Sequence, residues 1–264
     1  MRAEAAPPVA IVTGAARRIG AAIARRLANE GFLLLLHTSS ASKKEAEAEA
    51  ERILQRGGRA VAIECDLAHR EAARMLFDGA ERALGPVTLL INNASFFQPD
   101  RAEDFSADLL EHHMAVNLRA PLLLAQEMQR RLPADRQGAI VNVIDQRVLR
   151  PNPMYFTYSI CKSALWAATI TMAQAFAPKT RVNAIGPGPV FPNAYDGEAG
   201  FAEESAAVPL KRAASIEGIC DAVVYLANAR SVTGQLIAVD GGQHISWQTP
   251  DVLALNRRSA ADES

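Results

Sequence analysis

The sequence has little cysteine, no excess of charge and no long apolar run. Its three cysteines among 264 residues are isolated, and an odd number provides no disulfide framework. The 28 basic and 29 acidic residues leave a net charge of -1, which offers no electrostatic footprint for nucleic acid or an anionic membrane. No stretch approaches the ~18–20 apolar residues that cross a bilayer. The first eight residues contain no apolar signal region. These absences predict a cytoplasmic protein without nucleic-acid or membrane partners.

Short apolar runs alternate with longer helical patterns along the chain. The runs that predict strands are 9–12, 32–36, 60–63, 89–91, 139–143, 181–185 and 236–239. Near-continuous apolar strands are typical of a parallel sheet that is buried on both faces. No internal repeat or Pro/Gly/Ser-rich linker divides the chain. We therefore expect a single domain over 1–264. Its predicted fold class is α/β, a Rossmann-type doubly wound, seven-stranded parallel sheet with helices on both faces.

Helical patterns lie between these runs, and two segments show none. The helical patterns cover 19–27, 42–56, 109–124, 155–176 and 216–226. The segment 191–208 contains Pro, Asn, Asp and Gly, and we interpret it as a lid. The polar tail after residue 245 either packs on a neighbouring subunit or is disordered. We expect flexible ends at 1–7 and 247–264.

A glycine-containing turn follows the first predicted strand. It reads Thr13-Gly14-Ala15-Ala16-Arg17-Arg18-Ile19-Gly20 and leads into a helix. Backbone N–H groups and the helix dipole at such a turn favour the anionic oxygens of a pyrophosphate. Glycine lets the main chain approach the ligand closely. Taken alone, the motif also fits an ordinary tight strand–helix turn.

The two arginines of this turn indicate which dinucleotide is bound. A helix N-terminus is a poor place for cations unless a bound phosphate compensates them. An NAD-specific site would carry an acid after the second strand, and the segment Leu36-His37-Thr38-Ser39-Ser40 has none. Arg17 or Arg18, together with Ser39 or Ser40, would instead hold a 2′-phosphate. The sequence therefore predicts NADPH as the cofactor.

Tyr158 and Lys162 are four residues apart in a predicted helix and so share one face. An ordinary tyrosine has a pKa near ~10 and transfers protons poorly at neutral pH. A neighbouring cation lowers that pKa, so we expect Lys162 to make Tyr158 usable for proton transfer.

With these motifs, the chain resembles the short-chain dehydrogenase/reductase family over roughly residues 8–245. The motifs that carry the resemblance are the Thr13–Gly20 loop, Asp66-Leu67, Asn92-Asn93-Ala94, Asn117, Tyr158-x-x-x-Lys162, Gly186-Pro187-Gly188 and Val239-Asp240-Gly241-Gly242. The resemblance implies that Asp66 lies at the adenine, Asn93 and Ala94 along the ribose, and Pro187 and Gly188 near the nicotinamide. It also implies that Asn117 holds a water linked to Lys162, and that Asp240 is structural. The full expected cofactor set is Gly14, Arg17, Arg18, Ile19, Gly20, His37, Ser39, Ser40, Asp66, Leu67, Asn93, Ala94, Ser95, Tyr158, Lys162, Pro187 and Gly188.

Two departures from the family pattern point to one of its branches. Arg18 replaces the second loop glycine, and Asp145 stands where the catalytic serine precedes Tyr158. Both departures are similar to the pteridine reductase branch. In that branch an aromatic ring in the segment matching Asn93–Phe97 stacks on the pterin, and Phe97 is the better positional match, with Phe96 a core candidate. His37 also matches, whereas Ser40 replaces an arginine that the branch uses for the 2′-phosphate.

The chemistry agrees with this branch. A serine hydroxyl suits a ketone oxygen, whereas a pterin presents an amino group and ring nitrogens that call for an acceptor or a protonated acid. An ionised Asp145 would raise the pKa of Tyr158, so we hypothesise that Asp145 shares a proton with Tyr158 or the substrate. The predicted reaction is hydride transfer to a C=N carbon of a dihydropterin, with Tyr158 delivering the proton. The predicted catalytic residues are Asp145, Tyr158, Lys162 and Asn117, and the substrate-binding residues are Ser95, Phe97, Asp145 and Tyr158.

Several alternatives stay open at this stage. The chain is a carbonyl or 3-oxoacyl-carrier-protein reductase if Asp145 does not select a pterin. It is a non-catalytic NADP(H)-binding regulator if turnover has been lost. The five histidines have no metal-ligand spacing, and we expect the neighbours His112 and His113 at the surface or an interface. Cys161 reads as a small buried residue. The family resemblance implies a homotetramer.

Overall fold

The computed structural model describes residues 6–192, 195 and 197–249 of the chain. The predictions for 1–5, for 250–264 and for three positions of the 191–208 segment lie outside these residues. No helix in the described part of the chain is long and apolar enough to cross a membrane.

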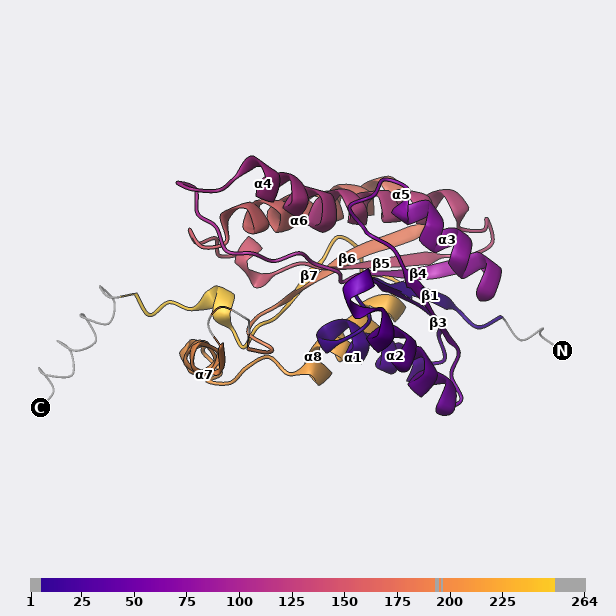
Figure 1. The fold of residues 1–264 in the computed structure, drawn as a ribbon, viewed down its shortest axis with the longest axis horizontal. Coiled ribbons are helices and arrows are strands. Elements are labelled where there is room, and N and C mark those ends of the chain that lie inside the picture. Colours follow the sequence, from indigo (N-terminus) through magenta and orange to yellow (C-terminus); the bar gives the residue numbers. More distant parts are fainter. Residues whose placement is uncertain (1–5, 193–194, 196, 250–264) are drawn as a thin grey trace, which may run out of the picture.

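Strands and helices alternate from β1 to β7 (Figure 1). The strands are β1 (Val9–Val12), β2 (Leu33–Thr38), β3 (Ala60–Glu64), β4 (Val87–Asn92), β5 (Gly138–Val143), β6 (Thr180–Pro187) and β7 (Leu236–Val239). The α-helices are α1 (Arg18–Asn29), α2 (Lys43–Gln55), α3 (Ala72–Ala83), α4 (Ala107–Met114), α5 (Ala120–Arg131), α6 (Phe156–Phe176), α7 (Gly197–Ala207) and α8 (Ile216–Asn228). Short helical turns are η1 (Ser40–Ser42), η2 (Ala115–Arg119, a π-helical turn), η3 (Gln146–Val148) and η4 (Gln243–Ile245).

The seven strands form one parallel sheet, as predicted. Their order is β3-β2-β1-β4-β5-β6-β7. Val12, at the end of β1, lies opposite Leu36 of β2 and Ile91 of β4. The direction of winding reverses between β1 and β4, so the loops after these two strands diverge around a crevice. That crevice is where an open α/β sheet binds its ligands.

Helices cover both faces of the sheet (Figure 1). The helices α1, α2 and α8 lie on one face, and α3, α4, α5 and α6 on the other. Each layer has its own apolar core. Ile23, Leu27 and Val223 pack under the first layer, and Leu76, Phe77 and Leu124 under the second. This arrangement confirms the predicted fold class. All three cysteines are buried, as expected for Cys161.

Two helices were missing from the sequence prediction. α3 buries Leu76 and Phe77 together with three alanines along one face, so its apolar stripe was present in the sequence and was overlooked. α7 lies in the 191–208 segment and buries none of its residues, so it has no apolar stripe to find. The segment therefore contains a helix where the prediction assigned no structure.

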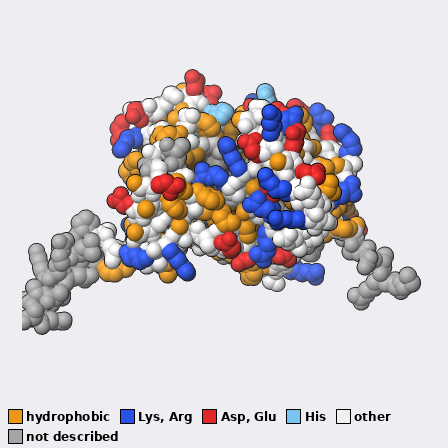
Figure 2. Space-filling view, turned by 60° about the horizontal axis from the view of Figure 1, so that its bottom comes forward, with side chains coloured by type: hydrophobic (Ala, Val, Ile, Leu, Met, Phe, Trp, Pro, Cys, Tyr) orange, Lys and Arg blue, Asp and Glu red, His pale blue; other side chains and the backbone are white. Residues whose placement is uncertain are grey.

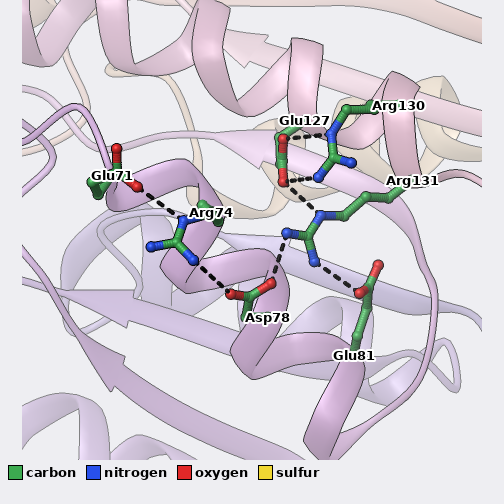
Figure 3. A network of polar contacts seen from close by, with 7 residues as sticks. All are labelled: Glu71, Arg74, Asp78, Glu81, Glu127, Arg130 and Arg131. Atoms are coloured by element: carbon green, nitrogen blue, oxygen red, sulfur yellow. Dashed lines mark hydrogen bonds and ion pairs between the residues drawn. The ribbon is translucent and has the colours of Figure 1, made fainter.

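An ion-pair network joins α3 to α5 (Figure 3). Arg131 donates to Glu127 at 2.6 Å, to Glu81 at 2.8 Å and to Asp78 at 2.6 Å. Burial lowers the pKa of Arg131, but the hydrogen bonds to these carboxylates outweigh burial and raise it above the usual value. These ion pairs hold the neighbouring helices α3 and α5 together.

Candidate active site

The predicted catalytic residues meet at the end of β5. Asp145 follows that strand and caps η3, while Tyr158 and Lys162 lie one turn apart on α6. The Tyr158 hydroxyl donates to Asp145 Oδ2 at 3.0 Å. Lys162 Nζ donates to the carbonyl of Val143 at 2.9 Å and lies 5.6 Å from the centre of the Tyr158 ring. Tyr158 and Lys162 are both buried.

Arg147 is part of this centre, and the sequence analysis missed it. Its backbone N–H donates to Asp145 Oδ1 at 2.8 Å, and its Nη1 donates to Asp145 Oδ2 at 3.2 Å. Its guanidinium lies 5.1 Å from the centre of the Tyr155 ring. The Nε of Arg147 is buried and has no hydrogen-bond acceptor among the described residues. The sequence did carry a signal for Arg147: it lies two residues after Asp145, just beyond a buried strand, where it can reach that carboxylate.

The pKa of Tyr158 differs from the value expected from the sequence, which was a lowered one. Burial raises the pKa of Tyr158 well above its usual value, Asp145 raises it further, and Arg147 lowers it. The expectation that Lys162 lowers this pKa is wrong for this structure, because burial and Asp145 outweigh any cation. Burial lowers the pKa of Lys162 to about 8. Burial also lowers the pKa of Arg147, but the charges of Asp145 and Tyr158 outweigh burial and raise it. At neutral pH, Tyr158 is therefore a neutral hydroxyl between two cations.

An aromatic cluster lies against the catalytic tyrosine. The ring of Phe97 is edge-on to Tyr158 at 4.8 Å and stacks on Tyr155 at 4.4 Å. Tyr155 has φ 56°, a left-handed backbone conformation that is strained for a bulky residue. Such strain is typical of functional sites. The structure thus brings Phe97, predicted to stack on substrate, next to Tyr158, the predicted proton donor, whereas Phe96 is half-buried against His112 and His113.

Asn117 lies in the π-helical turn η2 and is buried. Its side chain accepts from the backbone N–H of Phe96 at 2.8 Å and donates to the Phe96 carbonyl at 2.7 Å. It also accepts from the Ser95 hydroxyl at 3.2 Å. Asn117 therefore fixes the loop that carries Ser95 and Phe97. The expected bound water stays a prediction.

The predicted phosphate loop follows β1 and packs tightly against its surroundings. Gly14 has φ +64°, and a Cβ there would lie 2.9 Å from Ala94 Cα. A Cβ on Gly20 would lie 2.1 Å from the Gly14 carbonyl oxygen. Asn93 holds the loop through its side chain, which donates to the carbonyls of Thr13 and Gly14 at 2.9 and 3.1 Å. Only glycine permits these approaches, as a dinucleotide-binding loop requires.

The N-terminus of α1, next to Ile19, suits a phosphate. Its N-cap residue Arg17 makes no side-chain cap bond, and no acid lies in the first turn. The positive end of the dipole is therefore not neutralised by the helix itself. Arg17, Ser39 and Ser40 are all exposed. Figure 2, which brings the α1–α2 side forward, shows Lys and Arg side chains gathered on this face. The donor set fits the phosphates of a dinucleotide.

Arg18 and His37 have other partners in this structure. Arg18 donates to the Pro192 carbonyl at 3.2 Å and lies 5.1 Å from the centre of the Phe191 ring. His37 is buried, accepts from the Gly14 N–H at 3.1 Å and lies 3.1 Å from the Cys65 carbonyl. Burial lowers the pKa of His37 to about 4. His37 is therefore neutral at neutral pH, and its hydrogen bond from Gly14 helps to fix the conformation of the phosphate loop.

The other expected cofactor residues lie at or beyond the carboxyl ends of the strands. Asp66 is exposed after β3, next to the buried Leu67. Pro187 ends β6, and a Cβ on Gly188 would lie 2.7 Å from Asp240 Cα. The Asp240 carboxylate accepts from the N–H groups of Gly242 and His244 and so holds η4 in place.

One expectation about the histidines is wrong. His112 is exposed, but its neighbour His113 is fully buried and does not lie at the surface. His113 has a polar partner within the fold: its Nδ1 lies 2.7 Å from Thr157 Oγ1. Among the residues that the structure describes, no three His, Cys, Asp or Glu side chains are placed to hold a metal ion.

Comparisons with known proteins identify relatives of this chain. Residues 14–244 match the family model described as "Enoyl-(Acyl carrier protein) reductase". An oxidoreductase of unassigned activity from Methylorubrum extorquens is 34% identical over 244 residues, which are 89% of this chain and 96% of that protein. The 3-oxoacyl-[acyl-carrier-protein] reductase FabG of Staphylococcus epidermidis is 28% identical over 89% of this chain and 98% of its own length.

A solved structure is more similar still. The FolM alternative dihydrofolate reductase 1 of Brucella canis, crystallised with NADP, is 44% identical to this chain. The match covers 93% of this chain and 97% of that protein, with a TM-score of 0.90.

Proposed function

Because the chain belongs to the short-chain dehydrogenase/reductase family, we propose that it is an NADPH-dependent reductase of a dihydropterin. The observation that carries the substrate assignment is the hydrogen bond from Tyr158 to Asp145 Oδ2, with the Phe97 ring 4.8 Å from Tyr158. The likeness to an alternative dihydrofolate reductase supports it.

The reaction adds a hydride and a proton across a C=N bond. Bound NADPH supplies the hydride. Tyr158 carries the proton for the nitrogen, because burial and Asp145 raise its pKa and keep the hydroxyl protonated. The raised pKa by itself opposes release of that proton, so the transfer depends on cations that stabilise the phenolate. Lys162 and Arg147 are the cations that stabilise the phenolate left behind.

Asp145 works as a hydrogen-bond acceptor in this scheme. Arg147 donates to both of its oxygens, and Tyr158 donates to one of them. In all three of these hydrogen bonds the Asp145 side chain is the acceptor. Such a carboxylate orients the Tyr158 hydroxyl and accepts from the amino or ring N–H groups of a pterin, which a serine would serve less well. Phe97 provides a flat surface for the ring, and Ser95 lies beside it on the same loop.

The cofactor assignment follows from the phosphate loop. We place the pyrophosphate at the N-terminus of α1, and the adenosine along Asp66, Leu67, Asn93 and Ala94. The nicotinamide end lies toward Pro187 and Gly188. Since Arg18 is engaged with Phe191 and Pro192, Arg17 with Ser39 or Ser40 is the better candidate for the 2′-phosphate. Arg17→Ala should raise the KM for NADPH about tenfold or more and leave that for NADH nearly unchanged.

A carbonyl reductase is the second candidate. The likeness to a 3-oxoacyl-[acyl-carrier-protein] reductase favours it. Asp145 opposes it, because a carboxylate held by three donors repels the oxyanion that forms on a reduced ketone.

The test is NADPH oxidation by the purified protein with a dihydropterin, a β-ketoacyl thioester and a quinone, each repeated with NADH. Turnover confined to the dihydropterin with NADPH is expected. Turnover with the thioester alone would reject the dihydropterin assignment and support a carbonyl reductase. Cofactor binding without turnover of any substrate would make it a non-catalytic NADP(H)-binding protein.

We also propose a homotetramer. The catalytic helix α6 exposes Ile160 and Ile170, with 45% and 38% of their surfaces accessible in a single chain. Buried subunit contacts would cover such side chains. Mass photometry at submicromolar concentration should give four times the mass of the chain, and a monomer mass would contradict the assembly.

A further inference from the structure

A chain of polar groups, centred on the buried side chains of His113 and Thr157, joins the loop that carries Phe97 to α6. This loop, residues 95–100, is here called the aromatic loop. The Thr157 hydroxyl donates to the carboxylate of Asp100. Since its single hydrogen is used there, Thr157 Oγ1 accepts from His113 Nδ1, 2.7 Å away. His113 therefore carries its proton on Nδ1, and its Nε2 accepts from the backbone N–H of Gln98 at 3.4 Å.

Asp100 also caps α6 from outside the helix. The residue before the first turn, Tyr155, is left-handed and makes no side-chain cap bond. The Asp100 carbonyl accepts from the Phe156 N–H at 3.4 Å. Its carboxylate accepts from the Thr157 N–H at 3.2 and 3.3 Å. A carboxylate at a helix N-terminus satisfies orphan donors and complements the dipole.

The chain of groups connects the two parts of the proposed site. Phe97 lies in the aromatic loop, between Gln98 and the segment that Asn117 holds. Tyr158 directly follows Thr157 on α6. His113 and Asn117 are four residues apart, and both bond to the aromatic loop. The separation between the stacking ring and the proton donor is therefore set through these bonds.

We propose that Asp100, Thr157 and His113 form a positioning latch that fixes the aromatic loop against the first turn of α6. The latch rests on the proposed roles of Phe97 and Tyr158, and none of its members hydrogen-bonds to the reacting atoms. The His113 ring lies edge-on to the Tyr158 ring with 6.2 Å between their centres, a contact that both substitutions of His113 remove alike. Its Gln98 bond positions the ring that binds substrate. Its Thr157 bond positions the helix that delivers the proton.

Two substitutions of His113 separate these bonds. Asparagine places its amide near the position of Nδ1, so His113→Asn keeps the donor to Thr157 and loses the acceptor for Gln98. Glutamine reaches the position of Nε2, so His113→Gln keeps the acceptor and loses the donor. The expected result is a rise of about tenfold in substrate KM for His113→Asn and a fall of about tenfold in kcat for His113→Gln. The same substitutions at His112, which is exposed and packs its ring on Phe96, should change either constant less than about twofold.

Thr157 gives a second comparison. Thr157→Val removes the hydroxyl without changing the shape of the side chain and should lower kcat about tenfold. Thr157→Ser restores the hydroxyl and should restore kcat. Thr171→Val, the same change at an exposed position of α6, should leave kcat unchanged. Equal losses in Thr157→Val and Thr157→Ser would show a packing role and overturn the latch.

Hydrogen exchange tests the latch without substrate. The amides of residues 95–98 and 100 should exchange at least about fivefold faster in His113→Asn and Thr157→Val than in the parent protein, with β1 and β4 unchanged. Unchanged exchange in this loop would overturn the latch. Because exchange needs no turnover, failure of the dihydropterin assay would reject the proposed function and leave this result to decide the latch.

Discussion

Arg131 and Arg147 are both arginines with little exposed side chain, 14% and 18%, and they meet carboxylates in opposite ways. Arg131 lies between α3 and α5, and each of its nitrogens donates to a carboxylate of Asp78, Glu81 or Glu127 (Figure 3). Arg147 has one carboxylate, Asp145, and its buried Nε has no acceptor among the described residues.

The different partners of the two arginines indicate different roles, stability for Arg131 and turnover for Arg147. A cation surrounded by three acids has nothing further to bind, and its bonds serve to hold two helices together. Arg147 shares its one carboxylate with the Tyr158 hydroxyl and keeps a donor, Nε, without an acceptor among the described residues. It can therefore stabilise negative charge that develops beside it during a reaction. We therefore expect changes at the α3–α5 network to affect stability alone, and changes at Asp145, Arg147 and Tyr158 to affect turnover.

Tyr158→Phe should have the largest effect of the single substitutions. It removes the proton donor, and kcat should fall about a thousandfold. Tyr225→Phe, at an exposed position of α8, is the matched control and should leave kcat unchanged. A Tyr158→Phe enzyme with more than about a tenth of the parental kcat would remove Tyr158 from the chemistry.

Arg147→Leu should lower kcat about ten- to a hundredfold. The substitution removes the side-chain donor to Asp145 and leaves the backbone N–H bond of residue 147 in place. It also removes the cation that lowers the pKa of Tyr158. Arg131→Leu and Arg150→Leu, assayed in parallel, should keep kcat within about twofold of the parent. Equal losses in Arg147→Leu and Arg131→Leu would erase the distinction between the two arginines.

Arg131→Leu should instead lower the free energy of unfolding by about 1–3 kcal/mol, because it leaves Asp78, Glu81 and Glu127 without their common partner. Urea denaturation measures the change. The adjacent Arg130 has an exposed side chain, and its one ion-pair partner among the described residues is Glu127, so Arg130→Leu should show no measurable change. A stability loss at Arg130 equal to that at Arg131 would contradict this account of the network.

The pH dependence should be the smallest of these effects. The pKa of Lys162 is lowered to about 8 by burial, so this side chain loses its positive charge as the pH rises through that value. The Tyr158 hydroxyl then lacks one of its two cations, and kcat should fall about fourfold between pH 7 and 8.5. A kcat that stays level to pH 9.5 would show that the Lys162 charge is not needed.

Much of the fold was predictable because its signals are local. Continuous apolar runs marked all seven strands. The helix α7 buries no residue and so left no pattern. Tyr158 and Lys162 were predictable from their spacing on one helix face, and Asp145 and Phe97 from the resemblance to the pteridine reductase branch.

The partners of these residues were not predictable from spacing. Asp100 reaches α6 across 57 positions of sequence, and His113 reaches Thr157 across 44. His113 was expected at the surface because adjacent histidines on a helix point apart, but the direction of burial depends on how α4 packs on α6. Arg18 likewise bonds to Pro192, 174 positions away, and no local pattern encodes that contact.

The most direct test of the proposed function is the ratio of kcat/KM for a dihydropterin to that for a β-ketoacyl thioester, measured with NADPH for the parent protein and for Asp145→Ser. We predict a ratio well above one for the parent and a fall of at least about a hundredfold in Asp145→Ser, because serine serves a ketone oxygen and not the N–H groups of a pterin. An unchanged ratio would contradict the role of Asp145 in selecting the substrate, and with it the assignment of this chain as a dihydropterin reductase.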